Sequence, residues 1–474
     1  MALRIFLLIC VAAMVTSQAL AEPPLPVGLG DTAEAKQVTE EPQSEPALPE
    51  GLGDLNSSTS PTDSDGLTQP SALPGWRLSG FIDTRIGART REPIDQESFS
   101  LAETRLQLKA MRRWDGLTAT LTADLVADAV AETHRPDLGT GEWFLDLREA
   151  NLLWRATSWL DIKAGRQILT WGTGEYVFLN DLFPKDYKSF FIGRPDAYLK
   201  APSDAVKISL FGDIANLDIV YTPQFDADRF ADGTRLSIFN PFAQKITGDN
   251  AVLESDRPDR VFRNDEWAAR AYRVFGTYEG ALYVYDGYWK SPLGLSATEQ
   301  ALVFNRLRAY GASVRGPLAG GIANAEISAY DSADDRSGQD PLVPNSQVRF
   351  LLGYERELAT DLTGAVQYYL ERTSEYDALI QAAPFRAPRP DQTRHLWTGR
   401  IRKSLPSTHV TAMMFTAYSP NDQDGYVRAN LSWNATDNLS VETGANILFG
   451  SDRVTAFGQL QDNSNLFVAV RYGF

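Results

Sequence analysis

The chain has one cysteine, Cys10, among 474 residues. Cys10 lies in an apolar run that follows Arg4 and ends at Ala19-Leu20-Ala21, a pattern typical of a secretory signal peptide over residues 1–21. Once that segment is removed, the mature chain has no disulfide, no thiolate metal site and no thiol nucleophile. An exported protein of this size then needs a large hydrogen-bonded framework instead.

Long hydrophobic runs are also missing. Beyond residue 21 no segment approaches the ~18 apolar residues that a membrane helix requires. An exported chain without a second helix is periplasmic, secreted, or a β-barrel of the outer membrane. The net charge of −16 argues against nucleic acid as a partner.

Residues suited to catalysis are scarce. The three histidines, His134, His395 and His409, show no metal-ligand spacing, and no Gly-x-Ser-x-Gly elbow occurs. We therefore predict that the protein is not an enzyme and has no metal or cofactor.

Residues 22–75 form an acidic segment with ten Asp or Glu residues against one Lys, rich in Pro, Ser and Gly. Such a composition predicts a disordered tether, here on the periplasmic side. The sequence Leu-Pro-x-Gly-Leu-Gly-Asp at residues 25–31 recurs at residues 48–54. The repeat predicts a docking motif for a periplasmic partner; drift in a low-complexity segment and a plug for the barrel are the alternatives. The motif residues of interest are Leu29, Asp31, Leu52 and Asp54.

From Trp76 onward, runs of ten to fifteen residues alternate apolar and polar side chains and break at Gly, Pro, Asp or Asn. Each run is long enough to cross a bilayer as a tilted strand. The pattern predicts an all-β fold, an antiparallel transmembrane β-barrel over residues 76–474, with about 18 strands and 16 as the alternative. The predicted strands are 77–89, 99–113, 116–130, 143–155, 158–168, 204–212, 216–224, 267–276, 279–290, 307–315, 320–331, 347–357, 361–372, 394–404, 408–418, 424–433, 437–449 and 464–474.

The lengths of the connections support this fold. Those after even-numbered strands are short, whereas most of those after odd-numbered strands are longer, as between residues 168 and 204. Outer-membrane barrels have short periplasmic turns and long extracellular loops. A soluble β-sandwich has no reason to separate loop lengths in this way.

Two stretches resemble known families. Val468, Val470, Tyr472 and Phe474 share one face of the last run, which resembles the closing strand of outer-membrane porins and its aromatic assembly signal at Tyr472 and Phe474. Residues 165–172, Gly-Arg-Gln-Ile-Leu-Thr-Trp-Gly, resemble alginate-export-like and related porin-like proteins. The resemblance implies an outer-membrane location, contact with outer-membrane lipid and insertion by the barrel-assembly machinery.

The third long connection, 169–203, carries many Phe and Tyr residues and should pack against other parts of the chain. In porin-like barrels the third loop folds inward and narrows the pore. We therefore expect its aromatic residues to anchor it to the wall; an outward cap is the alternative. The charged residues expected at the pore constriction are Lys185, Asp186, Lys188, Arg194 and Lys200.

The alternation also predicts which wall charges face the lumen, and rings of charge set pore selectivity. These charges either form an anion path or pair with one another. We predict a channel for passage or export of a hydrophilic solute or polymer, with an anion favoured; the alternative is a structural or docking barrel for a periplasmic complex. The basic lumen residues are Arg85, Arg105, Lys109, Arg349, Arg400, Arg402 and Arg428.

Overall fold

The computed structural model describes residues 75–130, 144–383 and 390–474. The expected signal peptide and the repeated motif with Leu29, Asp31, Leu52 and Asp54 lie outside these residues, and both stay predictions. Within the described ranges, no helix is long and apolar enough to span a membrane.

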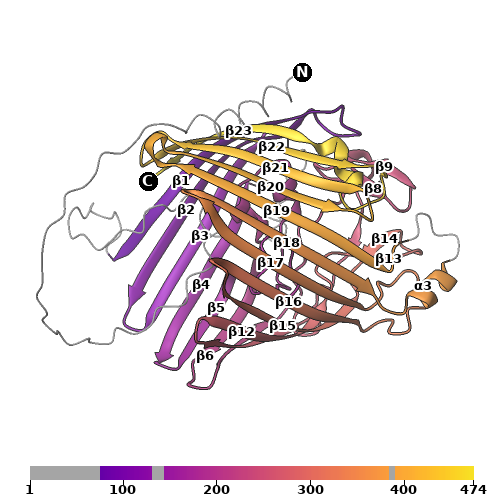
Figure 1. Ribbon diagram of the computed structural model, residues 1–474, viewed down its shortest axis with the longest axis horizontal. Helices are drawn as coiled ribbons and strands as arrows, with labels where there is room; N and C mark the ends of the chain where they lie inside the picture. Colours follow the sequence, from indigo (N-terminus) through magenta and orange to yellow (C-terminus); the bar gives the residue numbers. More distant parts are fainter. Residues whose placement is uncertain (1–74, 131–143, 384–389) are drawn as a thin grey trace, which may run out of the picture. The chain divides into compact units, whose positions relative to one another are not determined.

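Eighteen antiparallel strands form one closed sheet. Figure 1 shows the barrel from the side, with its strands next to one another. Neighbours in the chain are neighbours in the sheet, and β1 pairs with both β2 and β23, which closes the barrel. All eighteen predicted strands are present, which excludes the count of 16. They are β1 (Trp76–Arg89), β2 (Phe99–Trp114), β3 (Leu117–Asp128), β4 (Leu145–Thr157), β5 (Leu160–Ile168), β6 (Pro202–Leu210), β7 (Asn216–Thr222), β11 (Glu266–Phe275), β12 (Tyr278–Tyr288), β15 (Arg306–Leu318), β16 (Gly321–Ser332), β17 (Gln347–Ala359), β18 (Leu362–Thr373), β19 (Thr393–Leu405), β20 (Val410–Ser419), β21 (Asp424–Asn434), β22 (Leu439–Gly450) and β23 (Asn465–Gly473).

The two faces of the sheet differ as the alternation predicts. On β3, Leu121 and Leu125 are exposed on the outer face, whereas Thr122 and Asp124 are buried on the inner face. The same alternation of exposed apolar and buried polar residues recurs around the barrel. An apolar outer face with a polar interior is the arrangement of a transmembrane barrel, because lipid contacts the outside only.

The connections differ in length at the two ends of the barrel. Turns such as 115–116 between β2 and β3 are short, and we assign that end to the periplasm. The long loops at the other end hold the remaining elements. These are α2 (Tyr187–Ile192), η1 (Asp196–Leu199), β8 (Ile238–Asn240), β9 (Lys245–Thr247), η2 (Asp249–Ala251), β10 (Ser255–Asp256), β13 (Gly294–Ser296), β14 (Ala301–Val303), α3 (Tyr376–Ala382) and η4 (Gly458–Asn463), while η3 (Pro406–Thr408) lies in a periplasmic turn.

The last residue takes part in barrel closure. The backbone N–H of Gly80 donates to the carbonyl of Phe474 at 2.9 Å, and that of Phe474 donates to the carbonyl of Gly80 at 2.9 Å. The side chains of Tyr472 and Phe474 are about half exposed, and Tyr472 lies on the outward face with Val468 and Val470. Their role as an assembly signal stays a prediction.

Candidate pore constriction

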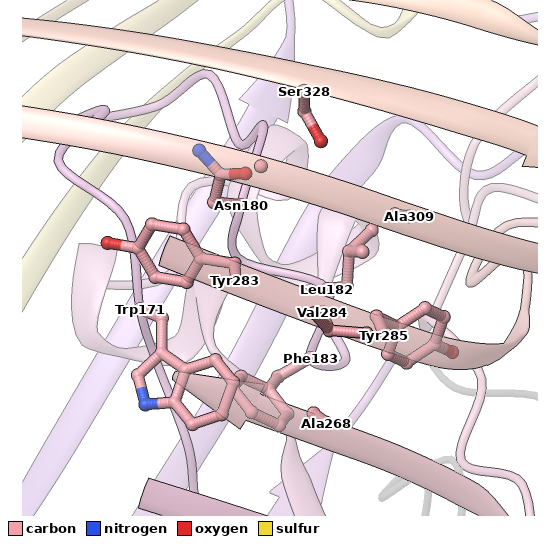
Figure 2. A pocket seen from close by; sticks show the side chains of 11 residues that line it. Trp171, Asn180, Leu182, Phe183, Ala268, Tyr283, Val284, Tyr285, Ala309 and Ser328 are labelled. Atoms are coloured by element: carbon pink, nitrogen blue, oxygen red, sulfur yellow. The ribbon is translucent and has the colours of Figure 1, made fainter. Parts of the chain in front are cut away.

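Loop 3, residues 169–201 between β5 and β6, begins on the inner wall formed by β11 to β16. Trp171 packs edge-on against Phe183 with ring centroids 4.9 Å apart, and lies 6.2 Å from the ring of Tyr283 on β12 (Figure 2). These rings belong to one buried cluster with residues of β7, β11, β15 and β16. The aromatic residues thus hold the first part of the loop against this side of the barrel.

Buried Glu326 of β16 fastens the same part of loop 3. Its carboxylate accepts hydrogen bonds from the Thr173 hydroxyl at 2.8 Å, the Gly174 N–H at 2.8 Å and the Asn180 side-chain amide at 2.7 Å. Hydrogen bonds to an ionised acceptor are among the stronger ones in proteins. Gly172 has a φ of +79° at this turn, which favours glycine.

The helix α2 lies against a different part of the wall. Asp186 caps it by accepting from the Ser189 N–H at 2.7 Å, and Gly193, with φ +103°, ends it. Phe190 and Phe191 pack on Tyr426 of β21, with ring centroids 5.3 and 5.5 Å apart. The apolar side of α2 therefore faces the strands near the end of the chain.

Side chains of the barrel wall donate hydrogen bonds to the backbone carbonyls at the C-terminal end of α2, which have no acceptor role within the helix itself. Arg428 donates to the Phe190 carbonyl at 2.9 Å, and Asn465 donates to the Phe191 carbonyl at 2.9 Å. Arg85 of β1 donates to the Gly193 carbonyl at 3.0 Å. In the closed sheet order, β16 is separated from β1 by seven strands, β17 to β23. Loop 3 is thus attached on nearly opposite sides and crosses the lumen.

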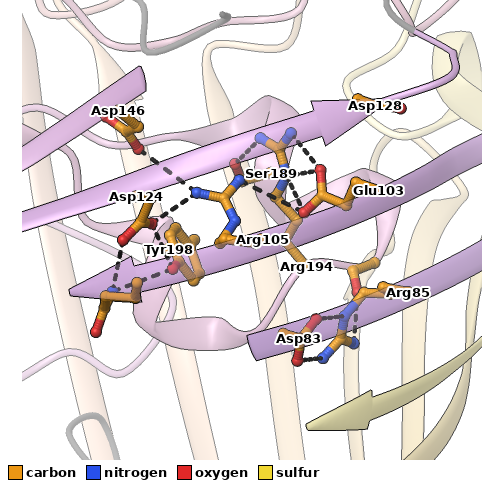
Figure 3. A network of polar contacts seen from close by, with 12 residues as sticks. Asp83, Arg85, Glu103, Arg105, Asp124, Asp128, Asp146, Ser189, Arg194 and Tyr198 are labelled. Atoms are coloured by element: carbon orange, nitrogen blue, oxygen red, sulfur yellow. Dashed lines mark hydrogen bonds and ion pairs between the residues drawn. The ribbon is translucent and has the colours of Figure 1, made fainter. Parts of the chain in front are cut away.

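A network of charges joins the end of loop 3 to β2 and β3 (Figure 3). Arg194 pairs with Glu103 at 2.7 Å, and Arg105 pairs with Asp124 at 2.7 Å. The Tyr198 hydroxyl donates to the same Asp124 carboxylate at 2.6 Å. Buried charges are tolerated when they are paired and hydrogen-bonded in this way.

Loop 4, residues 223–265, contributes a further set of pairs. Its Arg229 lies between Asp146 of β4, at 2.9 Å, and Asp186 of loop 3, at 3.2 Å. Its Asp232 pairs with Lys188 at 2.9 Å. Loops 3 and 4 therefore pack on each other and on the wall as one unit.

The five residues expected at the constriction all lie in this region. Lys185, Asp186 and Lys188 are 2, 2 and 6 % exposed, with Lys185 paired to Asp181 at 3.0 Å. Arg194 is ion-paired to Glu103, and Lys200 is half-buried, where burial lowers its pKa. The structure brings the five residues together, but four of them, Lys185, Asp186, Lys188 and Arg194, pair with residues of the loops or the wall. Their control of selectivity stays a prediction.

The seven basic lumen residues divide into two groups. Arg85, Arg105, Arg349, Arg400 and Arg428 each pair with a carboxylate, for example Arg428 with Asp196 at 2.8 Å. Lys109 and Arg402 make no ion pair within the described ranges. Four of the five have a carboxylate partner on the barrel wall, whereas Arg428 pairs with Asp196 of loop 3. The choice between an anion path and pairing among wall charges stays a prediction.

Some residues of the network were not identified from the sequence. Glu103 occupies the same face of β2 as Arg105, so the alternation alone was sufficient to find it. Arg229 and Asp146 were not identified, and neither was the pairing of Arg229 with the predicted residue Asp186, because these contacts depend on how loop 4 folds and the sequence carries no periodic signal for that loop. In the part of the chain that the structure describes, no group of three or more His, Cys, Asp or Glu side chains is placed to hold a metal.

No protein-family model and no curated protein matches the chain. Solved structures do match. Pseudomonas aeruginosa OccK2 (OpdF) in complex with glucuronate is 11 % identical, with a TM-score of 0.51 over 85 % of this chain and 98 % of that one. Pseudomonas aeruginosa OccK5 (OpdH) is 10 % identical, with a TM-score of 0.50 over 85 % and 98 %. The narrower resemblance to alginate-export-like proteins stays a prediction. The closed eighteen-stranded sheet, its apolar outer face and these neighbours identify the chain as an outer-membrane β-barrel with the porin fold.

Proposed function

We propose that this barrel is a non-enzymatic outer-membrane channel for a small hydrophilic anion, in which loop 3 sets the size limit. The observation that carries the proposal is the attachment of loop 3 to Glu326 on one side and to Arg85, Arg428 and Asn465 on the other. The interior of an eighteen-stranded barrel is wide unless something narrows it. A loop fixed across it restricts passage to the space left beside the loop.

The preference for anions rests on two points. Lys109 and Arg402 occupy lumen-facing strand positions and lack an ion-pair partner among the described residues, so their charge is available to a solute. In addition, the neighbour OccK2 was solved with glucuronate, an anion. Charged side chains that line a pore select ions of opposite sign.

Conductance in a planar lipid bilayer tests the channel. We expect the purified, heat-modifiable barrel to form discrete conductance steps and to show a reversal potential of anion-selective sign in a potassium chloride gradient. A folded barrel without conductance would contradict the proposal and favour a structural or docking barrel. Insertion by the barrel-assembly machinery and docking of a periplasmic partner to the repeated motif remain proposals of their own.

A further inference from the structure

A recess of about 640 Å³ lies on the inner side of the barrel at its periplasmic end, where β19 to β23 and β1 meet the short turns. We call it the periplasmic recess. Its volume lies within the range of small-molecule sites. Several of the residues that line it lie on the inner face of the strands, where they alternate with outward-facing residues such as Trp433 and Tyr472. These lining residues are Arg402, Ser404, Thr411, Ser432, Asn434 and Arg471.

The recess lies close to the constriction. Arg400 of β19 pairs with Glu175 of loop 3 at 2.5 Å. Arg402 is two residues further along the same inner face of that strand, toward the periplasmic turn, which is roughly 7 Å. A solute that passes loop 3 therefore meets the recess next.

The recess carries charges of both signs: Arg402 and Arg471 lie on the inner face, and exposed Asp437 lies in the turn between β21 and β22. The Arg402 side chain makes no hydrogen bond or ion pair with any described residue. Arg471 pairs with Asp83 at 3.0 Å and lies over the ring of Phe81 at 4.2 Å. A cation without an ion-pair partner attracts anions, so Arg402 is the group in the recess that is suited to hold an anion.

The opposite wall is different. At the periplasmic ends of the strands there, Lys207 pairs with Asp218 at 3.4 Å and Arg270 pairs with Glu279 at 2.5 Å. These two basic residues of the opposite wall are therefore paired, whereas Arg402 in the recess has no ion-pair partner among the described residues.

Neutral polar groups complete the recess. Ser404 is opposite Thr411 in the ladder, and Thr411 is opposite Ser432, so three hydroxyl groups form a row across β19, β20 and β21. Asn434 is opposite Ser440 on the neighbouring pair. The side chains of this set make no hydrogen bond with other residues that the structure describes, which leaves their donors and acceptors for water or a ligand.

We propose that the periplasmic recess binds a polyhydroxylated carboxylate. The Arg402 guanidinium receives the carboxylate, for which its planar fork of donors is suited, and the row of Ser404, Thr411 and Ser432 exchanges hydrogen bonds with the hydroxyl groups of the ligand. The arrival of such a ligand from outside rests on the proposed channel function. Binding itself does not, because the recess opens toward the periplasm.

Titration calorimetry of galacturonate against the folded barrel in detergent tests the site. We expect saturable binding that Arg402→Gln weakens about tenfold or more, since a charged hydrogen bond is lost, and that Arg402→Lys weakens less. The matched control is Lys207→Gln on the opposite wall, which should bind as the wild type does. Heat-modifiable mobility on gels verifies that each variant is folded.

Two further probes separate the parts of the site. Glucose lacks the carboxylate and acetate lacks the hydroxyl groups, so each should bind more weakly than galacturonate. The double variant Ser432→Ala, Asn434→Ala should weaken galacturonate and leave acetate unchanged. If this double variant lost affinity equally for galacturonate and for acetate, the proposed role of the hydroxyl row would be overturned.

Equal galacturonate binding by the wild type and Arg402→Gln, or no binding by the folded wild type, would overturn the proposal. The outcome is separable from the channel function. Conductance without galacturonate binding contradicts the recess alone, and binding without conductance supports the recess while contradicting the channel.

Discussion

The lumen differs between the level of loop 3 and the level of the periplasmic recess. At loop 3, the guanidinium groups of Arg105 and Arg229 are buried, that of Arg194 is mostly buried, and each faces a carboxylate within 3 Å. At the recess, Arg402 is half-buried and has no partner in the described chain. The same residue type therefore holds the loop in place at one level and is free for a solute at the other.

This difference separates two tasks that a pore must combine. Narrowing the barrel requires a loop that stays in place. Charged side chains that form ion pairs hold the loop, but each is largely neutralised by its partner and so contributes little to the electrostatic potential of the pore. Selecting a solute requires charges that can exchange partners. We therefore expect size limit and selectivity to depend on different residues of this barrel.

The largest effect should follow removal of loop 3. Deletion of residues 176–192 should raise single-channel conductance several-fold, an order-of-magnitude expectation for a widened pore. Deletion of residues 376–382, which removes α3 from another long loop, is the matched control and should change conductance little. An unchanged conductance in an assembled 176–192 deletion would place the size limit elsewhere.

Breaking one buried pair should weaken the attachment of the two loops. Arg229→Gln leaves Asp146 and Asp186 without their shared cation, and loss of one partner of a buried pair costs about 3–5 kcal/mol. Urea unfolding in detergent, followed by tryptophan fluorescence, measures the change. The control is Arg336→Gln, because the Arg336–Asp331 pair is exposed and such pairs contribute about 0–1 kcal/mol. Equal losses would show that burial of the first pair adds nothing.

Reversal potentials compare the charges of the two levels directly. The triple variant Lys185→Gln, Lys188→Gln, Arg194→Gln should shift selectivity toward cations, because three positive charges are removed. Arg402→Gln removes only one charge, but it should change the permeability ratio about as much as the triple variant does, roughly twofold, because Arg402 has no ion-pair partner among the described residues. A negligible shift for Arg402→Gln would remove the distinction between the two levels.

The smallest effect concerns pH. Burial raises the pKa of Glu175 in loop 3 to about 7; nearby Arg400 opposes the rise, and Glu355 and Asp196 add to it. The folded loop thus retains a proton that an unfolded chain releases near pH 4.5. The stabilisation by this group is complete below about pH 4.5 and is lost as the pH rises through about 7.

Glu175→Gln should remove that dependence. We expect the unfolding temperature of the wild type to fall by a few degrees more than that of the variant between pH 5 and pH 8. Calorimetry of both proteins in the same detergent measures the difference. Parallel pH profiles would assign the dependence to other groups.

Much of the barrel was predictable because strand and loop patterns are local. The two-residue alternation places Arg105 and Arg402 on the inner face and Leu121 on the outer face without any knowledge of the neighbours. The content of aromatic residues in loop 3 likewise indicated that the loop packs against something. Such features depend on residues close together in the chain.

The amino-acid sequence by itself therefore determined the eighteen strands and the sides they present to lipid and lumen. It also indicated that loop 3 packs against other residues, but it left open whether the loop folds inward or forms an outward cap. Only the tertiary structure decided which charged side chains form ion pairs. Arg229 reaches Asp146 across 83 positions and Arg428 reaches Asp196 across 232, and these contacts depend on how loops without periodicity cross the barrel. That packing decides which charged residues are ion-paired, as at loop 3, and which are not, as Arg402 in the recess, because a charged side chain can be buried away from water only where the fold supplies a partner.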